Sequence, residues 1–185
     1  MNRLVLKIHE YLEQAAEGKV KVDPKLLEEF GERVKKNLKK QIEDRKEFKL
    51  RMSNIGRPLR QLMLEQKYGK AKPSPEFMLK MLFGDLYESL VLYLLKASGV
   101  EITEQDAEVI LPIKTAKGVV NIGGTLDVGI KIKEEDGIYD VKSASPYSFT
   151  NKFEPNSILT GDDAFGYVDQ LFGYAKARGK KATKK

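Results

Sequence analysis

The chain has 185 residues, of which 41% are hydrophobic and 32% are charged, and its formal net charge is +6. This length suits one domain with an appended segment, and the positive charge suits a polyanionic partner. The absence of cysteine excludes disulfides, cysteine-ligated zinc and cysteine-ligated iron–sulfur clusters. With only one histidine, a metal must be held by oxygen ligands, which favours magnesium, manganese or calcium. No hydrophobic run reaches the ~18 residues of a membrane span and the N-terminus lacks a signal-peptide core, so we expect a soluble, cytoplasmic protein.

The first hundred residues are predicted to be helical. Residues 3–16 have apolar side chains at helical spacing, and Asp23-Pro24 starts a long helix over roughly residues 25–50. The apolar stripe of this long helix is narrow and its opposite face is highly charged, which predicts an arm outside the core. A short helix should end near residue 68, and the most apolar helix, about residues 76–97, should be buried against a sheet.

After residue 99 the periodicity changes to that of strands. Strands are predicted over residues 107–113, 119–132 and 138–143, with turns at Lys117-Gly118 and Asp136-Gly137. A loop over residues 144–161, a last helix that ends near residue 177 and a basic tail complete the chain. We therefore expect an α+β fold with a small, mostly antiparallel sheet flanked by helices.

Asp127, Asp140 and Lys142 are the first candidates for chemistry. Side chains two residues apart on a strand share a face, so Asp140 and Lys142 should point the same way. A carboxylate holds a hard cation, and a neighbouring ammonium stabilises developing phosphate charge, which points to metal-dependent phosphodiester hydrolysis. If Asp140 pairs with Lys131, Asp127 lies ~13 Å along the strand, and a bulge or bend at Gly129 must close that gap. For Asp127 alone, a solvent-facing strand position is the alternative.

Two helices offer further polar groups. Glu88 is a candidate acid of the apolar helix, although an acid at the solvent-facing edge explains it equally well; Asp85, one turn earlier on nearly the same face, is the competing candidate. Gln170 and Tyr174 share a face of the last helix. Alone, such a pair is more simply explained by a surface polar residue beside a packed aromatic.

Taken in chain order, Gly84-xxx-Glu88, Gly124-x-x-Asp127, Asp140-x-Lys142 and Gln170-xxx-Tyr174 resemble the motifs of the PD-(D/E)xK nuclease superfamily, and most of all its RecB-like branch, which includes phage recombination exonucleases. The resemblance covers residues from about 77 to 177 and implies a restriction-endonuclease-like core that cleaves DNA with Mg²⁺ or Mn²⁺. It also implies roles for single residues: metal ligation by Glu88, Asp127, Asp140 and the backbone carbonyl of Val141, catalysis by Lys142, and support of the lysine or of the DNA backbone by Gln170 and Tyr174. The chain departs from the family pattern in three ways, because no proline precedes Asp127, no histidine marks the first helix of the core, and no strand is predicted after the last helix.

The resemblance extends to the expected partner and to the division of the chain. Residues 53–57 resemble the serine-containing loop that opens many RecB-like domains, although a capped, helix-breaking loop explains them equally well. Candidate DNA contacts are Ser53, Asn54, Arg57, Arg60, Ser143 and Ser145. We expect a charged arm over residues 1–52, the nuclease core over 53–177, and a basic tail over 178–185 that adds salt-dependent affinity.

The implied function is that of an exonuclease in phage-type DNA recombination or repair, acting on DNA in the cytoplasm of its own cell or of a phage host. A second copy of the chain or a recombination protein is the further partner that this function implies. The alternatives are an endonuclease of the same superfamily, of structure-specific or restriction type, and a catalytically silent DNA-binding module.

Overall fold

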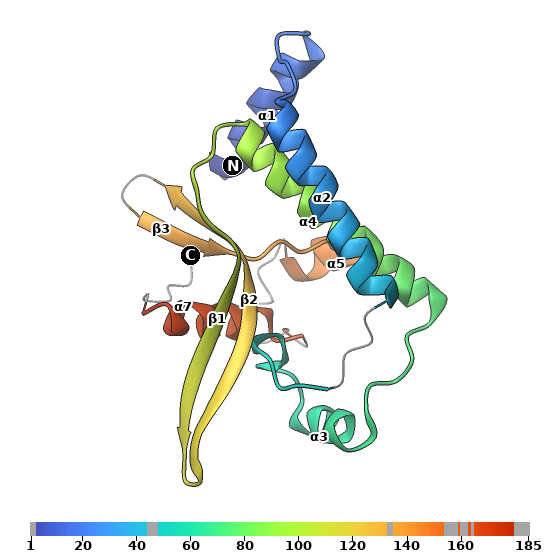
Figure 1. Ribbon diagram of the computed structural model, residues 1–185, viewed down its shortest axis with the longest axis vertical. Helices are drawn as coiled ribbons and strands as arrows, with labels where there is room; N and C mark the ends of the chain where they lie inside the picture. The colour runs from blue at the N-terminus through green and yellow to red at the C-terminus, as the bar shows by residue number, and fades with distance from the viewer. Residues whose placement is uncertain are drawn as a thin grey trace.

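The computed structural model describes residues 3–43, 48–132, 135–153, 159, 163 and 165–179, and these form an α+β fold with a three-stranded antiparallel sheet (Figure 1). The helices are α1 (Arg3–Ala16), α2 (Pro24–Glu43), the 3-10 helix η1 (Met52–Asn54), α3 (Leu59–Tyr68), α4 (Pro75–Ala97), α5 (Pro146–Ser148), the π-helix η2 (Phe149–Phe153) and α7 (Tyr167–Ala177). The strands are β1 (Ile102–Thr115), β2 (Gly118–Ile132) and β3 (Glu135–Tyr139). The predicted α+β class is therefore confirmed, but β1 is longer and β3 ends earlier than predicted, α2 ends at Glu43 and not near residue 50, and α5 and η2 occupy part of the segment predicted to be a loop.

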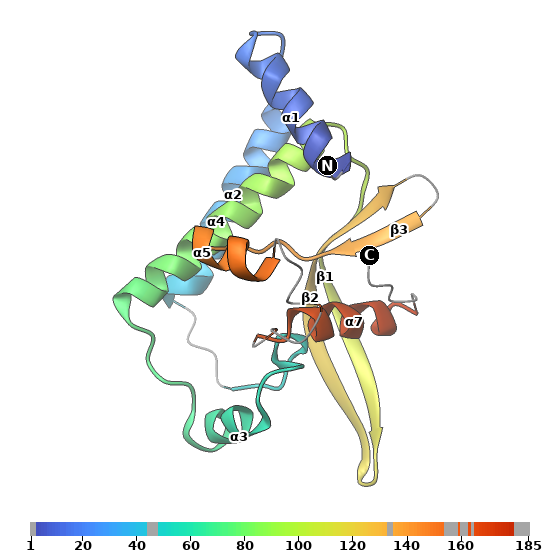
Figure 2. The same ribbon diagram turned by 180° about the vertical axis from the view of Figure 1, so that it is seen from behind.

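The N-terminal helices pack together on one side of the molecule. Both views show α1, α2 and α4 side by side (Figure 1, Figure 2). The Phe30 ring of α2 lies 5.8 Å from the Tyr93 ring of α4, and Lys96 of α4 forms an ion pair with Glu29 of α2. The charged stretch that we expected to stand apart as an arm thus lies against the most apolar helix. No helix in the described residues has both the length and the apolar character needed to cross a bilayer.

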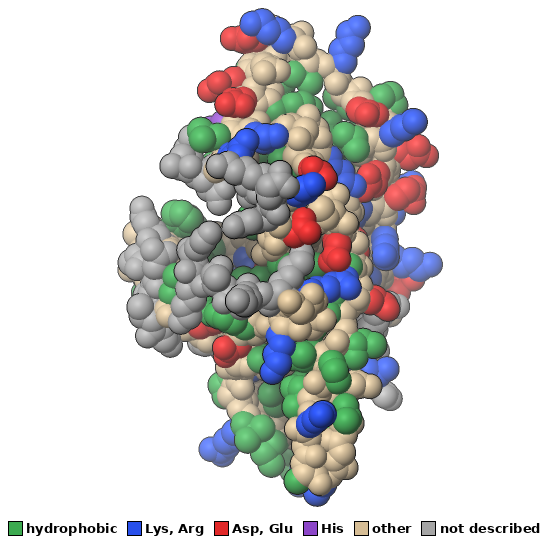
Figure 3. Space-filling model, turned by 90° about the vertical axis from the view of Figure 1, so that its left-hand side faces the viewer, with side chains coloured by type: hydrophobic (Ala, Val, Ile, Leu, Met, Phe, Trp, Pro, Cys, Tyr) green, Lys and Arg blue, Asp and Glu red, His purple; other side chains and the backbone are tan. Residues whose placement is uncertain are grey.

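β1 and β2 form a long hairpin whose far end extends beyond the helices (Figure 1). The hairpin closes between Thr115 and Gly118, where Gly118 has a φ of +121° that side chains disfavour. On the face shown in Figure 3, hydrophobic and basic side chains, but few acids, lie over this end of the molecule. The exposed hydrophobic residues of the hairpin are Ile110, Ile113, Val119 and Val120.

Alternate residues of the hairpin are buried, as expected for strands with one covered face. The buried set comprises Val109, Leu111, Ile122, Leu126, Val128 and Ile130. One part of it packs with η1 and α7 around Met52 and Tyr174, and the other packs with α4 around Leu92 and Leu95. The core is therefore held from two sides, by η1 and α7 and by α4.

Gly124 of β2 allows Met52 and α7 to approach the sheet closely. A Cβ at Gly124 would lie 2.5 Å from the Met52 Cβ and 3.0 Å from the Tyr174 ring, whereas a Cβ at the adjacent Gly123 would meet nothing within 4 Å. We predict that Gly124→Ala lowers the free energy of unfolding by about 1–3 kcal/mol because of overpacking. Urea denaturation of both alanine variants measures this, with Gly123→Ala expected within about 0.5 kcal/mol of the wild type. Equal losses in the two variants would contradict the packing described here.

Candidate active site

Asp127 on β2 and Asp140, the first residue after β3, lie one position beyond the last pair of the two strands. Val128 pairs with Tyr139 in the antiparallel register, so the next positions along the ladder are Asp127 and Asp140. β3 ends at Tyr139, and Asp140 begins the segment that leads away from the sheet. The sheet thereby brings two carboxylates together that are separated by a whole hairpin in the sequence.

This register differs from the predicted one. We expected Asp140 to pair with Lys131, but Lys131 pairs with Asp136, because the hairpin turns earlier in the chain than the Asp136-Gly137 pair indicated. The expected gap between Asp127 and Asp140 therefore does not exist, and no bulge is needed to close it. An irregularity does occur beside Gly129, but it belongs to the pairing of β2 with β1.

Lys142 connects the two carboxylates. Its Nζ lies 2.6 Å from Oδ2 of Asp140 and 3.8 Å from Oδ2 of Asp127, and the latter oxygen also accepts a 3.0 Å hydrogen bond from the Val141 amide. The Asp140 side chain is only 5% exposed, and its Oδ1 is buried without a hydrogen-bond partner among the described residues. Because buried carboxylate oxygens are nearly always satisfied, this unpartnered atom identifies a position that suits a cation or a donor from a ligand.

Burial and like charges perturb the acids of this cluster. The pKa of Asp127 rises from 3.8 to about 7, first because of burial and then because of the Asp140 and Glu88 carboxylates. Burial also raises the pKa of Glu88, against the opposing effect of Arg33. For Lys142, burial acts to lower the pKa, but the neighbouring carboxylates, Asp140 foremost, outweigh it and the pKa is raised. The cluster thus carries more negative charge than its lysine balances.

The acid of α4 that belongs to this cluster is Glu88. Its charge contributes to the raised pKa of Asp127, and its carboxylate forms an ion pair with Arg33 of α2. Asp85, the competing candidate, instead accepts a 2.8 Å hydrogen bond from Gln41. No three carboxylate or histidine side chains in the described residues gather closely enough to surround a metal by themselves. The centre is therefore the Asp127–Asp140 pair with Lys142, and Glu88 lies beside it.

The polar pair of α7 lies under β2, close to Asp127. Gln170 and Tyr174 are both buried. The Tyr174 hydroxyl donates a 2.6 Å hydrogen bond to the carbonyl of Thr125, and Gln170 Nε2 donates to the Tyr174 oxygen over 3.4 Å. Burial raises the pKa of Tyr174, which keeps its hydroxyl protonated as a donor. The pair thus fixes the β2 backbone two residues before Asp127, and the simpler reading of a surface glutamine does not hold.

α7 also reaches the lysine directly. The Lys142 ammonium lies 5.8 Å from the centre of the Tyr167 ring, within the range of a cation–π contact. Sequence reasoning missed Tyr167. It also missed Arg33 and Asp106, which form an ion pair with each other. One signal for Arg33 was available in the sequence: it lies three residues after Phe30, which places it beside the apolar stripe of α2.

The candidate DNA contacts fall into two groups. Three have partners within the fold: Asn54 Oδ1 accepts from the Arg51 amide over 2.8 Å, Arg57 forms an ion pair with Glu65 at 3.1 Å, and Ser145 caps α5. Ser145 is nevertheless exposed, as are the other three, Ser53, Arg60 and Ser143. The end of the basic tail, residues 180–185, lies outside the described residues.

Comparisons of this chain with protein-family models, with curated proteins and with solved structures return no match.

The pKa of Asp127 predicts a pH-dependent stability. Because the pKa of Asp127 is higher in the folded than in the unfolded state, the contribution of this group to the free energy of unfolding is fully present below the ordinary pKa of 3.8. That contribution is lost as the pH rises through about 7. Asp127→Asn removes this loss and retains an acceptor for the Val141 amide. We predict that, in EDTA, the variant gains melting temperature relative to the wild type more at pH 8 than at pH 5. A gain that is larger at pH 5 would contradict the buried, carboxylate-rich environment of Asp127.

Proposed function

We propose that the protein is a metal-dependent DNA nuclease with a restriction-endonuclease-like core. The observation that carries the proposal is the cluster of Asp127, Asp140 and Lys142, in which a carboxylate on β2 and a carboxylate directly after β3 share one lysine. Strongly perturbed acids that cluster with a specific charge partner are typical of functional sites. The resemblance of the ordered motifs to RecB-like nucleases supports the reaction class.

The donor atoms fit a hard divalent cation. All candidate ligands are oxygens, one of them is the unpartnered Oδ1 of Asp140, and the pKa of Asp127 is raised by burial and then by the neighbouring carboxylates. Mg²⁺ or Mn²⁺ would be held by Asp127, Asp140 and the Val141 carbonyl, with Glu88 as the further carboxylate. When bound, such a cation lowers the pKa of water and neutralises charge on a phosphate.

The remaining residues act on the phosphate and on the geometry of the site. Lys142 stays protonated at neutral pH because its pKa is raised, and its ammonium can donate to a phosphate oxygen as charge develops there. Tyr174 and Gln170 hold the β2 backbone, which keeps Asp127 in place. Hydrolysis adds water across one P–O bond: the hydroxyl goes to phosphorus and the proton to the departing sugar oxygen.

DNA is the proposed substrate because the ordered motifs resemble those of DNA nucleases and because the chain offers basic surface outside the site. The hairpin from residue 109 to 126 contains two lysines and no acid, and Arg60 is exposed on α3. Phosphate contacts of this kind give affinity without sequence preference. We further propose an exonuclease of phage-type recombination or repair in the cytoplasm, which works as a homo-oligomer or with a recombination protein; an endonuclease of the same superfamily is the alternative.

Two substitutions test the reaction. Asp140→Asn should abolish cleavage and weaken Mn²⁺ binding measured by calorimetry, whereas Lys142→Ala should lower the cleavage rate ~10²-fold or more at nearly unchanged DNA affinity. End-labelled linear DNA and closed circular DNA, with Mg²⁺ or with a chelator, report both activity and mode. Loss of linear DNA alone indicates an exonuclease, and loss of the circle indicates an endonuclease. DNA binding without any Mg²⁺- or Mn²⁺-dependent cleavage would reject the nuclease proposal in favour of the silent module.

The two acids of α4 provide a matched pair of variants. Glu88→Ala should reduce cleavage because Glu88 lies beside Asp127, while Asp85→Ala, which only removes the bond from Gln41, should leave the rate within about threefold of the wild type. Rates are compared at saturating Mg²⁺. The reverse order, with Asp85→Ala inactive and Glu88→Ala active, would show that the other acid serves the site.

A further inference from the structure

Arg33 of α2 joins three elements at the edge of the candidate site. Its side chain is only 8% exposed, and it forms ion pairs with Glu88 of α4 and with Asp106 of β1. A buried arginine with two carboxylate partners is held in one geometry, and it holds both partners in turn. We call these three residues the Arg33 clamp.

The backbone at Asp106 supports a specific role for the clamp. Asp106 has a φ of +49°, the one non-glycine residue with positive φ in the described part of the chain. Such a conformation is uncommon in a strand, and aspartate and asparagine tolerate it best. The register pairs Gln105 with Val128 and Ala107 with Leu126, so Asp106 lies across from Asp127. The strand thus departs from regular geometry next to the site, where its carboxylate meets Arg33.

The charges of the clamp decide what it can do. A lone arginine beside a metal ligand would repel a divalent cation, but the carboxylate of Asp106 neutralises Arg33. Arg33 therefore offers Glu88 a hydrogen-bond donor with little added net charge. Its bond goes to Oε1 of Glu88, while Oε2 has no hydrogen bond to any described residue. One oxygen is thus fixed and the other is free for a cation.

We propose that Arg33, with Asp106 as its counter-ion, is a positioning residue that orients Glu88 toward the cation of the candidate site. This inference rests on the proposed function. It would make α2, through Arg33, a support of the metal site and not only a charged arm. Groups that hydrogen-bond to metal-ligating carboxylates generally contribute a further 10- to 100-fold in metal affinity or activity.

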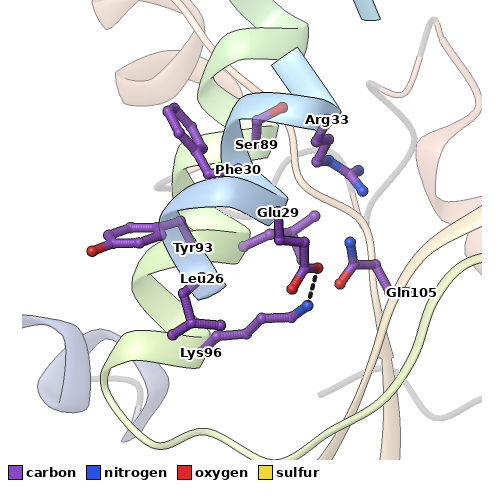
Figure 4. A pocket seen from close by; sticks show the side chains of 9 residues that line it. Leu26, Glu29, Phe30, Arg33, Ser89, Tyr93, Lys96 and Gln105 are labelled. Carbon is purple, nitrogen blue, oxygen red and sulfur yellow. Dashed lines mark hydrogen bonds and ion pairs between the residues drawn. The ribbon is translucent and has the colours of Figure 1, made fainter. Parts of the chain in front are cut away.

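The same two helices provide a control. Lys96 and Glu29 join α4 to α2 close to Arg33, and the side chains of this pair face each other while the Arg33 guanidinium lies apart from them (Figure 4). Lys96→Met therefore removes an ion pair between α2 and α4 without touching Glu88. If Arg33→Met weakens metal binding and Lys96→Met does not, the loss is due to the clamp and not to the packing of α2 against α4.

The test is calorimetric titration of Mn²⁺ into the wild type, Arg33→Met, Asp106→Asn and Lys96→Met. We expect Arg33→Met and Asp106→Asn each to weaken Mn²⁺ binding about tenfold or more, and Lys96→Met to bind like the wild type. Charge repulsion alone gives a different pattern, because removal of the arginine would then tighten binding. Unchanged or tighter binding by Arg33→Met would therefore overturn the clamp.

Two additions keep the result interpretable. Thermal melting checks that each variant is folded. If Arg33→Met is not folded, Asp106→Asn decides the question, because asparagine suits the positive φ at that position. Wild-type Mn²⁺ affinity in Asp106→Asn would then overturn the clamp.

The second addition is a double variant. In a Glu88→Gln background, Arg33→Met should cause no further loss of Mn²⁺ affinity, because the clamp acts through Glu88. A full further loss would overturn the clamp. Failure of the wild type to bind Mn²⁺ would reject the proposed function itself, whereas wild-type binding with normal binding by Arg33→Met would reject the clamp alone.

Discussion

Two carboxylates are held together where water is largely excluded, and this constraint shapes the centre of the molecule. Asp127 lies on β2 and Asp140 directly after the paired end of β3, and burial, followed by repulsion from Asp140, raises the pKa of Asp127 to about 7. Only Lys142 and the Val141 amide offset that cost among the described contacts. A folded chain keeps such an arrangement at the expense of stability, which is typical of sites that bind a charged ligand.

The surrounding packing fixes these carboxylates rigidly. On one side, Met52 lies against Gly124 and Gly173, and the Tyr174 hydroxyl holds the Thr125 carbonyl. On the other side, α4 carries Glu88, which Arg33 holds from α2. Groups on regular helices and strands are placed more precisely than groups on loops. The N-terminal helices are therefore joined to the same centre as the sheet, so that their removal would disturb the site directly.

Apolar periodicity predicted the elements well, because helices and strands bury their faces at different spacings. It also brought Asp140 and Lys142 together, since that contact is local. The register of β2 with β3 could not be predicted, because a turn shifted by a few residues leaves the alternating pattern almost intact. That one shift decides whether Asp127 faces Asp140 or lies far along the strand.

The long-range polar contacts were beyond the reach of pattern analysis. Arg33 and Asp106 are 73 residues apart in the sequence, and each resembles an ordinary surface charge on its own element. The long second helix was likewise expected to be an arm because its apolar stripe is narrow and its opposite face is highly charged, and the pattern did not show that Arg33 is buried. The roles of Glu88 and Asp85 were likewise separable only when the partners of each, Arg33 and Gln41, were known.

The most direct measurement is a crystal structure of the wild-type protein with Mn²⁺, in which anomalous scattering locates the metal without reference to activity. The account predicts a Mn²⁺ peak between Asp127 and Asp140, with carboxylate oxygens at roughly 2.1 Å and the Lys142 ammonium displaced from the shared oxygens. A structure with Mn²⁺ bound elsewhere, or with Lys142 still joining the two carboxylates at high Mn²⁺ concentration, would contradict it.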